Sequence, residues 1–330
     1  MNFCNCARCE VRRVTLWDAQ IHAENCAGFV MPGPCTSCLF EDNILYRQCP
    51  GIESDGPCTG TAFLYNFLDQ SVWMPGTSAQ AQWLSIDANH GPHGCMNLYE
   101  GNYANNMIND GYHGSGSHFT FFRNRMHGFD ETGDLNNSKC VDLNRWSLYN
   151  NVVGNILGTS GVANVYDEKT NGYGKSHLTI YRFGYPNLGN SSFTGYRPPL
   201  TNARDAAQSY QALDEAVRPT SEYAGKGVST PVRNPPQGAP SGTVRGTSIV
   251  EGNYDTVSGK MVWNDPSIGA QTIPASLYYP SKPAYFNSLA WPPFDPTNPG
   301  DTSGANVPAG GSAIPAGYRF NHRGADPGRR

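Results

Sequence analysis

Histidine, acidic and arginine side chains are concentrated between residues 87 and 125. Facing histidines and carboxylates can transfer protons in general acid–base catalysis, and the arginine fork matches a substrate carboxylate. We therefore expect an enzyme's catalytic residues here, with His113 or His118 as acid or base, Asp110 orienting the histidine, and Arg123 or Arg125 holding the carboxylate. Side chains that satisfy their own loop backbone are the structural alternative.

Residues that could bind a sugar lie in the same stretch and in the insertion before it. Flat aromatic rings stack on pyranose faces, while histidine and carboxylate groups bond to hydroxyls. The substrate-binding candidates are His90, His93, Asp87, Tyr112, Trp83 and Trp73. Each aromatic could equally serve packing. Calcium is an open alternative, because carboxylates supply its oxygen ligands at Asp130, Glu131, Asp134 and Asp142.

A repeated asparagine indicates which elements position these residues. An apolar run precedes asparagine in "LFEDN", "FLYN", "LYEGN", "FFRN" and "VVGN". From Asp18, a candidate earlier member, the steps are 25, 23, 36, 22 and 31 residues. These steps end at Asn43, Asn66, Asn102, Asn124 and Asn155. A solenoid repeat with loop insertions in its longer steps produces this spacing.

The repeat predicts an all-β fold, a right-handed parallel β-helix (solenoid) of about six coils. We expect each asparagine to adopt the left-handed conformation at a corner and to bond to the next in a ladder. The preceding aromatic side chains should stack inside. Adjacent coils lie about 4.8 Å apart, so Glu100 and Arg123 could form an ion pair.

The chain divides into two parts of one domain. Residues 1–195 carry the coils, and 196–330 supply a last coil plus an irregular Pro/Gly-rich C-terminal wrap. The last coil is predicted where "EGNY" recurs, and a helix is predicted over 205–218. A disordered tail is the alternative for 225–245 and 296–312.

Composition excludes some partners. With 23 Lys+Arg against 27 Asp+Glu the formal charge is −4, which gives no electrostatic argument for nucleic acid or an anionic membrane. No apolar run reaches the 18 residues of a membrane span. The N-terminus has no signal-peptide core, and we expect that a signal and further N-terminal coils precede it in a secreted protein.

Ten cysteines lie within the first 140 residues. This density favours disulfides in an oxidising compartment or buried thiols. Zinc is the rival interpretation, because "CNCARC" and "CTSC" have ligand-like spacing, although "CTSC" lacks a close second partner motif.

Several phrases resemble the secreted right-handed parallel β-helix proteins of the pectate-lyase-like superfamily. They are "CARCEVRRV", "FLYNFLDQSVWM", "HGPHGCMNLYEGN", "HGSGSHFTFFRNR", "YNNVVGNILG", "PASLYYPSKPAYF" and "IPAGYRF". The resemblance implies extracellular action on an acidic or plant-type polysaccharide. The superfamily's hydrolase motifs, NTD and an Asp pair, are absent from this sequence, as is its lyase motif RxPxxR.

Three functions follow from this sequence. The first is an extracellular protein that cleaves an acidic polysaccharide by lyase or hydrolase chemistry. The second is a carbohydrate-binding protein without catalysis. The third is a structural, tailspike- or fibre-like protein that self-associates through an open N-terminal coil.

Overall fold

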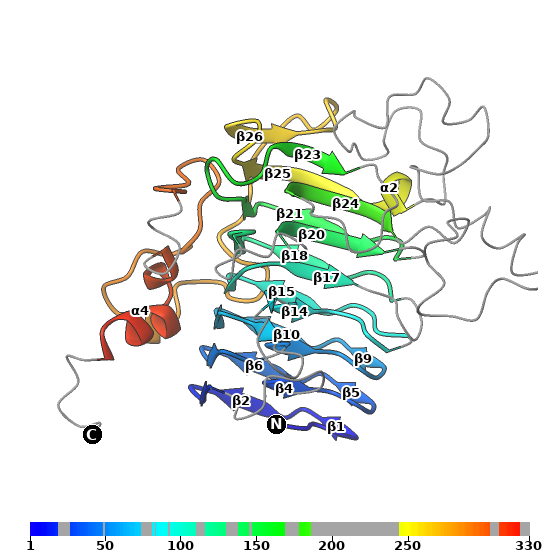
Figure 1. Ribbon diagram of the computed structural model, residues 1–330, viewed down its shortest axis with the longest axis vertical. Coiled ribbons are helices and arrows are strands. Elements are labelled where there is room, and N and C mark those ends of the chain that lie inside the picture. The colour runs from blue at the N-terminus through cyan, green and yellow to red at the C-terminus, as the bar shows by residue number, and fades with distance from the viewer. Residues whose placement is uncertain are drawn as a thin grey trace, which may run out of the picture.

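The computed structural model describes residues 1–18, 27–48, 50–73, 81–82, 84–91, 93–109, 116–129, 138–144, 147–168, 178–185, 244–303 and 310–323. These residues form mostly short strands in parallel sheets, with few helical turns (Figure 1). This confirms the all-β, parallel-strand part of the fold prediction. The predicted helix over 205–218 lies outside the described residues.

The chain visits three parallel sheets in the same order on each early passage. A three-stranded sheet contains β1 (Cys6–Ala7), β5 (Cys35–Thr36) and β9 (Cys58–Thr59). A seven-stranded sheet contains β4 (Phe29–Val30), β8 (Ile52–Glu53), β14 (Ile86–Asp87), β17 (Met107–Asn109), β20 (Lys139–Asn144), β24 (Thr179–Tyr185) and β23 (Val165–Glu168).

The largest sheet has 14 strands in two arms. One arm is β2 (Glu10–Arg12), β6 (Leu39–Glu41), β10 (Ala62–Leu64), β15 (Leu98–Glu100), β18 (Thr120–Phe122) and β21 (Asn151–Val153). The other is β3 (Thr15–Trp17), β7 (Ile44–Tyr46), β11 (Phe67–Asp69), β16 (Tyr103–Ala104), β19 (Arg125–Met126) and β22 (Ile156–Leu157). The long strand β25 (Ile249–Asp255) pairs with the last strand of both arms.

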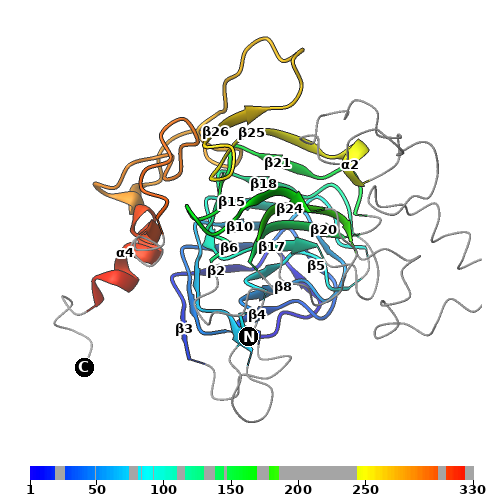
Figure 2. The same ribbon diagram turned by 45° about the horizontal axis from the view of Figure 1, so that its top comes forward.

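Strands of successive passages lie one above another. In Figures 1 and 2 the first arm follows in order from β2, near the N-terminus, to β21 below β25. Antiparallel pairs join β26 (Lys260–Trp263) to β25, and β12 (Val72–Trp73) to β13 (Ala81–Gln82). The helical turns are α2 (Val244–Thr247), η3 (Ala284–Phe286), η5 (Gly311–Ala313) and α4 (Pro315–Asn321).

The asparagine ladder is confirmed. Each buried amide donates from Nδ2 to the Oδ1 of the next asparagine, at 2.9–3.0 Å, from Asn43 through Asn66, Asn102, Asn124 and Asn155 to Asn253. Each Oδ1 also accepts a backbone N–H of the previous passage, as when Asn66 N–H donates to Asn102 at 3.0 Å. The amides thereby satisfy backbone groups at a corner where strand pairing is interrupted.

Two details of the ladder prediction are wrong. The left-handed corner residue is the one before each asparagine, for example Tyr65 (φ 53°) and Gly101 (φ 67°), because the asparagine side chain is needed as a hydrogen-bonding group instead. Asp18 is not a ladder member. The backbone N–H that reaches Asn43 belongs to Val14, at 2.9 Å, and Asp18 occupies a different left-handed corner.

Aromatic rings fill the core beside this ladder, as predicted. Phe40, Phe63, Tyr99 and Phe121 stack in one column, with successive ring centroids 5.0, 4.7 and 5.3 Å apart. These residues occupy matching positions in β6, β10, β15 and β18. Alternating side-chain directions therefore turn one residue of each strand inward and its neighbours outward.

The segment after β26 lies along the outside of the 14-stranded sheet (Figure 1). The phenol groups of Tyr279 and Tyr285 donate to Glu41 at 2.5 and 2.6 Å, and Arg319 of α4 bonds to Asp42 at 2.7 Å. Glu41 and Asp42, whose carboxylates point outward, thus attach the C-terminal segment to the sheet.

Eight cysteines are described, and no disulfide joins any two of them. The disulfide prediction is therefore wrong for this set. Buried thiols, the other half of that prediction, are present at Cys35, Cys38, Cys58 and Cys140. A parallel ladder stacks cysteine on cysteine in register, as in β1 and β5, without bringing their sulfur atoms to bonding distance.

Candidate functional site

Two loops meet at the outer face of the seven-stranded sheet. One follows β8 and carries Asp55, the other follows β14 and carries His90, and Glu53 and Asp87 are the last residues of those two strands. The two strands pair in register, with Glu53 beside Asp87. The backbone N–H of His90 donates to the Ser54 carbonyl at 2.8 Å, which fixes the second loop against the first.

Gly91 permits this close approach. Its N–H donates to the same Ser54 carbonyl at 3.1 Å. A Cβ atom at this position would lie 2.1 Å from the Asp55 carbonyl oxygen, so any larger residue would push the loops apart. The glycine therefore sets the spacing of the cluster formed by Glu53, Asp55, Asp87 and His90.

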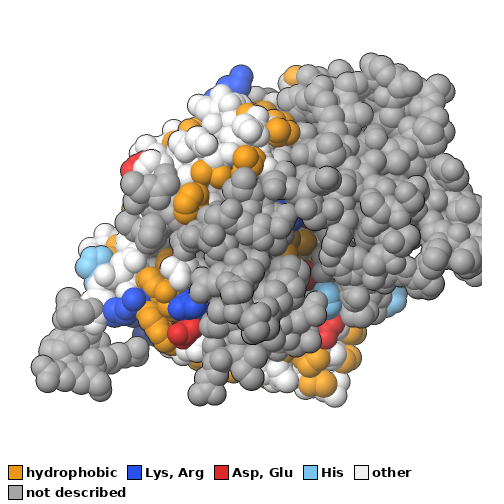
Figure 3. Space-filling view, viewed as in Figure 1, with side chains coloured by type: hydrophobic (Ala, Val, Ile, Leu, Met, Phe, Trp, Pro, Cys, Tyr) orange, Lys and Arg blue, Asp and Glu red, His pale blue; other side chains and the backbone are white. Residues whose placement is uncertain are grey.

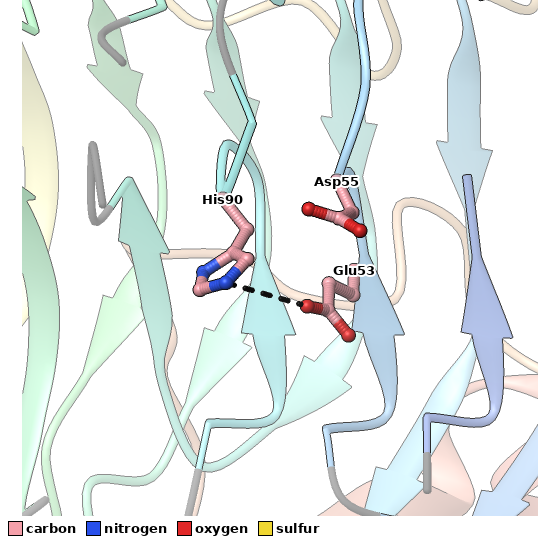
Figure 4. Close-up of side chains that lie close together, drawn as sticks. All are labelled: Glu53, Asp55 and His90. Atoms are coloured by element: carbon pink, nitrogen blue, oxygen red, sulfur yellow. Dashed lines mark ion pairs between the residues drawn. The ribbon is translucent and has the colours of Figure 1, made fainter. Parts of the chain in front are cut away.

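The imidazole of His90 faces Glu53 and Asp55 (Figure 4), and it also contacts the carboxylate of Asp87. Its Nδ1 is 3.5 Å from Asp87 Oδ2, and its Nε2 is 3.9 Å from Glu53 Oε1. One ligand atom from each of Glu53, Asp55 and His90 lies within 4.8 Å of the others. The backbone N–H of Asn89 donates to Asp87 Oδ1 at 3.3 Å and orients that carboxylate.

The cluster is reachable from one side. The Asp87 and Glu53 side chains are 1% and 8% exposed, while 24% of His90 is exposed and Asp55 is half-buried. Carboxylate and imidazole groups are the side chains that most often act as acids and bases in catalysis. The arrangement is therefore suited to acid–base chemistry at its open side.

The same atoms could hold a cation. A set of one imidazole nitrogen and two carboxylates matches zinc or a similar transition ion better than calcium, which prefers oxygen ligands alone. Three of the predicted calcium ligands, Asp130, Glu131 and Asp134, lie outside the described residues. The fourth, Asp142, is buried and pairs with Arg182 and Lys139 instead.

The structure brings together two of the predicted residues, Asp87 and His90. His93 is exposed in the left-handed region (φ 69°). The residues His113, Asp110, Tyr112 and Trp83 lie outside the described part of the chain, as does the side chain of Trp73. Their roles stay predictions.

Arg123 and Arg125 lie elsewhere, and both are buried. The Arg123 guanidinium donates to the carbonyls of Ile273, Pro274 and Phe294 at 3.0, 2.7 and 3.0 Å. Arg125 donates to the Met126 carbonyl at 2.9 Å. Burial lowers the pKa of both side chains. Their contacts are structural, and capture of a substrate carboxylate by either one stays a prediction.

Glu100 and Arg123 are both described residues, and they do not form the expected ion pair. Glu100 instead accepts from Tyr65 Oη at 2.8 Å, from the Leu277 N–H at 2.9 Å and from the Ser276 hydroxyl. Burial raises the pKa of its carboxyl group, and these donors oppose that rise. Both residues therefore anchor the C-terminal segment.

His118 lies at a different corner, next to a shallow depression. Its exposed ring stacks on Tyr149 with centroids 5.2 Å apart, and Nδ1 lies 2.8 Å from Ser117 Oγ. The depression has a volume of about 350 Å³. It is lined by Met96, Asn97, Leu98, His118, Thr120 and Leu277.

The sequence reasoning missed Glu53 and Asp55. A signal was available, since "GIESD" carries acids after an isoleucine as "SIDAN" does, and Ile52 pairs with Ile86. Alignment of the two isoleucines, rather than of the asparagines, would have placed Glu53 beside Asp87.

No family model, curated protein or solved structure matches this chain. Within the residues that the structure describes, no helix has the length and apolar character needed to cross a bilayer. On the face shown in Figure 3, acidic and basic side chains of the described surface are scattered among hydrophobic and uncharged ones.

Proposed function

We propose that the protein is a right-handed parallel β-helix that cleaves a polysaccharide by hydrolysis. The fixed order of sheets, the asparagine ladder and the aromatic column support the solenoid. Its handedness follows from a general rule, because connections between parallel strands of one sheet are right-handed in about 98% of cases.

One observation supports hydrolysis: Glu53, Asp55 and His90 meet within 4.8 Å at a place that solvent can reach. Retaining glycosidases use two carboxyl groups about 5 Å apart, one as acid and one as nucleophile. In this proposal Glu53, the more buried carboxyl, protonates the leaving oxygen. Asp55 bonds to the anomeric carbon as the glycosidic bond breaks. Water, which gives a proton to Glu53, then attacks the same carbon and displaces Asp55.

His90 has a positioning role in this proposal. Its ring lies against Asp87 on one side and Glu53 on the other. These two contacts orient the carboxylates and hold Glu53 toward the substrate in this proposal. Loss of His90 should therefore change the pH profile of hydrolysis as well as its rate.

Hydrolysis is favoured over lyase chemistry by the charges present. A lyase has to neutralise the uronate carboxylate, and both predicted arginines bond to backbone carbonyls instead. The cluster is rich in carboxylates, so it would repel a uronate unless a cation lay between them. We therefore propose a neutral polysaccharide as substrate and extracellular action as the setting.

A binding role without catalysis is the second candidate, and the depression beside His118 favours it. The stacked His118 and Tyr149 rings, with exposed Met96 and Leu277, offer a flat apolar surface next to the polar Thr120. Such a surface suits the face of a sugar ring. In that case polysaccharide would bind and no bond would break.

A screen of neutral and acidic polysaccharides tests the proposal. New reducing ends without unsaturated products, from a neutral polymer and in the presence of chelator, are the expected result. Unsaturated products that absorb in the ultraviolet would identify a lyase instead. Binding with no product from any polymer would leave the second candidate.

A further inference from the structure

The two Cys-x-x-Cys motifs, "CARC" and "CTSC", lie directly above one another. In β1 and β5 Cys6 pairs in register with Cys35. The Leu39 N–H donates to the Cys9 carbonyl at 2.8 Å and Glu10 pairs with Leu39, which places Cys9 beside Cys38. The paired cysteines are 29 residues apart in the sequence, and the stacking of successive passages brings them together.

The same corner shape turns all four side chains inward. Each motif surrounds one left-handed residue, Arg8 (φ 56°) in the first and Ser37 (φ 55°) in the second. Cys35 and Cys38 are buried in the main core, and the half-buried Cys6 and Cys9 pack against it.

Most later residues in the Cys9–Cys38 column bond to the backbone through their side chains. Thr61, Asn97 and Asn150 accept backbone N–H groups of the preceding passage, whereas Phe119, between Asn97 and Asn150, has no acceptor. A thiol is a weak acceptor and serves this purpose poorly. The thiols at Cys9 and Cys38 instead donate to the carbonyls of Ala7 and Thr36, at 3.8 and 3.4 Å.

We propose that Cys6, Cys9, Cys35 and Cys38 form a binding site for one thiophilic metal ion, Zn²⁺ or an ion of similar softness. Four thiolates from two Cys-x-x-Cys motifs are a tetrahedral ligand set for zinc. This site lies at a different corner from the carboxylate cluster and does not depend on the proposed hydrolysis.

The spacing of the strands suits such a site. Adjacent strands lie about 4.8 Å apart. Zn–S bonds of about 2.3 Å in a tetrahedron separate the sulfurs by about 3.8 Å. Among the described residues, the group with three ligand atoms within 4.8 Å of one another is Glu53, Asp55 and His90, so no three of the four sulfur atoms are this close. To bind a metal, the thiols therefore have to break their hydrogen bonds to nearby carbonyls and turn toward one another.

Proton release should accompany binding. Since only thiolates bind the metal, each thiol loses its proton to solvent as its metal–sulfur bond forms. Apparent affinity should therefore rise with pH.

Titration of the reduced 330-residue chain with Co²⁺ tests the site, because thiolate-to-cobalt charge transfer reports sulfur ligands. The carboxylate cluster contains no sulfur and cannot produce this band. We expect the charge-transfer band to saturate at one thiolate-bound Co²⁺ per chain, and Zn²⁺ should displace this ion. The half-buried Cys9→Ser and the buried Cys38→Ser should each weaken binding by more than about tenfold, since even indirect partners of metal ligands contribute about 10- to 100-fold.

Cys95→Ser is the matched control, because Cys95 is half-buried near Thr59, outside the four-thiol set. It should bind Co²⁺ as the wild type does. Absence of the charge-transfer band in the wild type would overturn the proposal, and so would a band of full strength in both Cys9→Ser and Cys38→Ser. A zinc-dependent rise in the wild-type melting temperature, absent in Cys9→Ser, is expected even if Cys38→Ser fails to fold.

Discussion

Truncation of a single ladder amide, in Asn102→Ala, should destabilise the fold strongly. Asn102 is fully buried and makes four side-chain hydrogen bonds. It donates to the Phe63 carbonyl at 2.9 Å and to Asn124 Oδ1 at 3.0 Å, and it accepts from the backbone and side-chain nitrogens of Asn66 at 3.0 Å each.

The size of the effect follows from the groups left without this partner. Truncation removes the bonds that Asn102 makes to the Asn66 N–H and the Phe63 carbonyl, while Asn124 still accepts from the Asn102 N–H at 2.9 Å. An unsatisfied buried group costs about 1–3 kcal/mol, so two cost about 2–6 kcal/mol. This is a large share of a typical folding free energy of about 5–15 kcal/mol.

Urea denaturation followed by circular dichroism measures the loss. Asn151→Ala is the matched control, because this half-buried asparagine lies outside the ladder and donates one bond to Thr120 at 3.0 Å. It should lose only about 0.5–1.5 kcal/mol. Equal losses for the two variants would refute the reasoning that ladder amides satisfy buried backbone groups.

Three further predictions concern the outer face and the depression. Burial raises the pKa of Glu251 to about 7 from an ordinary 4.5, so the folded state binds this proton more tightly than the unfolded state and stability falls as the pH rises from about 4.5 to about 7. The melting temperature of Glu251→Gln should fall less over this pH range than that of the wild type, and an equal fall would contradict this. Arg123→Met should lower the melting temperature and speed proteolysis of the C-terminal segment, because three carbonyls lose their donor; wild-type values for both would show the contact to be dispensable. His118→Ala should weaken polysaccharide binding yet keep the cleavage rate at saturation, and unchanged affinity would exclude the depression as a sugar site.

The repeated part of the fold could be predicted because its signal is local. The apolar run followed by asparagine encodes both the aromatic column and the ladder, and the second "EGNY" marks where Asn253 continues it. The left-handed residue could not be assigned in this way. Its position accepts tyrosine, glycine or arginine, as at Tyr65, Gly101 and Arg123, so no single residue type marks it.

The roles of outward-facing residues could not be predicted because they depend on distant partners. Arg123 meets carbonyls about 150 residues later in the chain, and Glu41 meets Tyr279. The carboxylate cluster could not be predicted for a related reason. Loop insertions make the steps between passages unequal, so neither Glu53 beside Asp87 nor Cys9 beside Cys38 follows from sequence distance.

The initial rate of reducing-end release, from the polysaccharide that the screen identifies, tests the proposed hydrolysis most directly in Glu53→Gln. This variant keeps the size of the side chain and removes its acid, so the rate should fall by about 100-fold or more while the melting temperature stays near that of the wild type. Glu10→Gln, which alters a 61% exposed acid, should match the wild-type rate. A wild-type rate in folded Glu53→Gln would contradict the assignment of catalysis to this cluster.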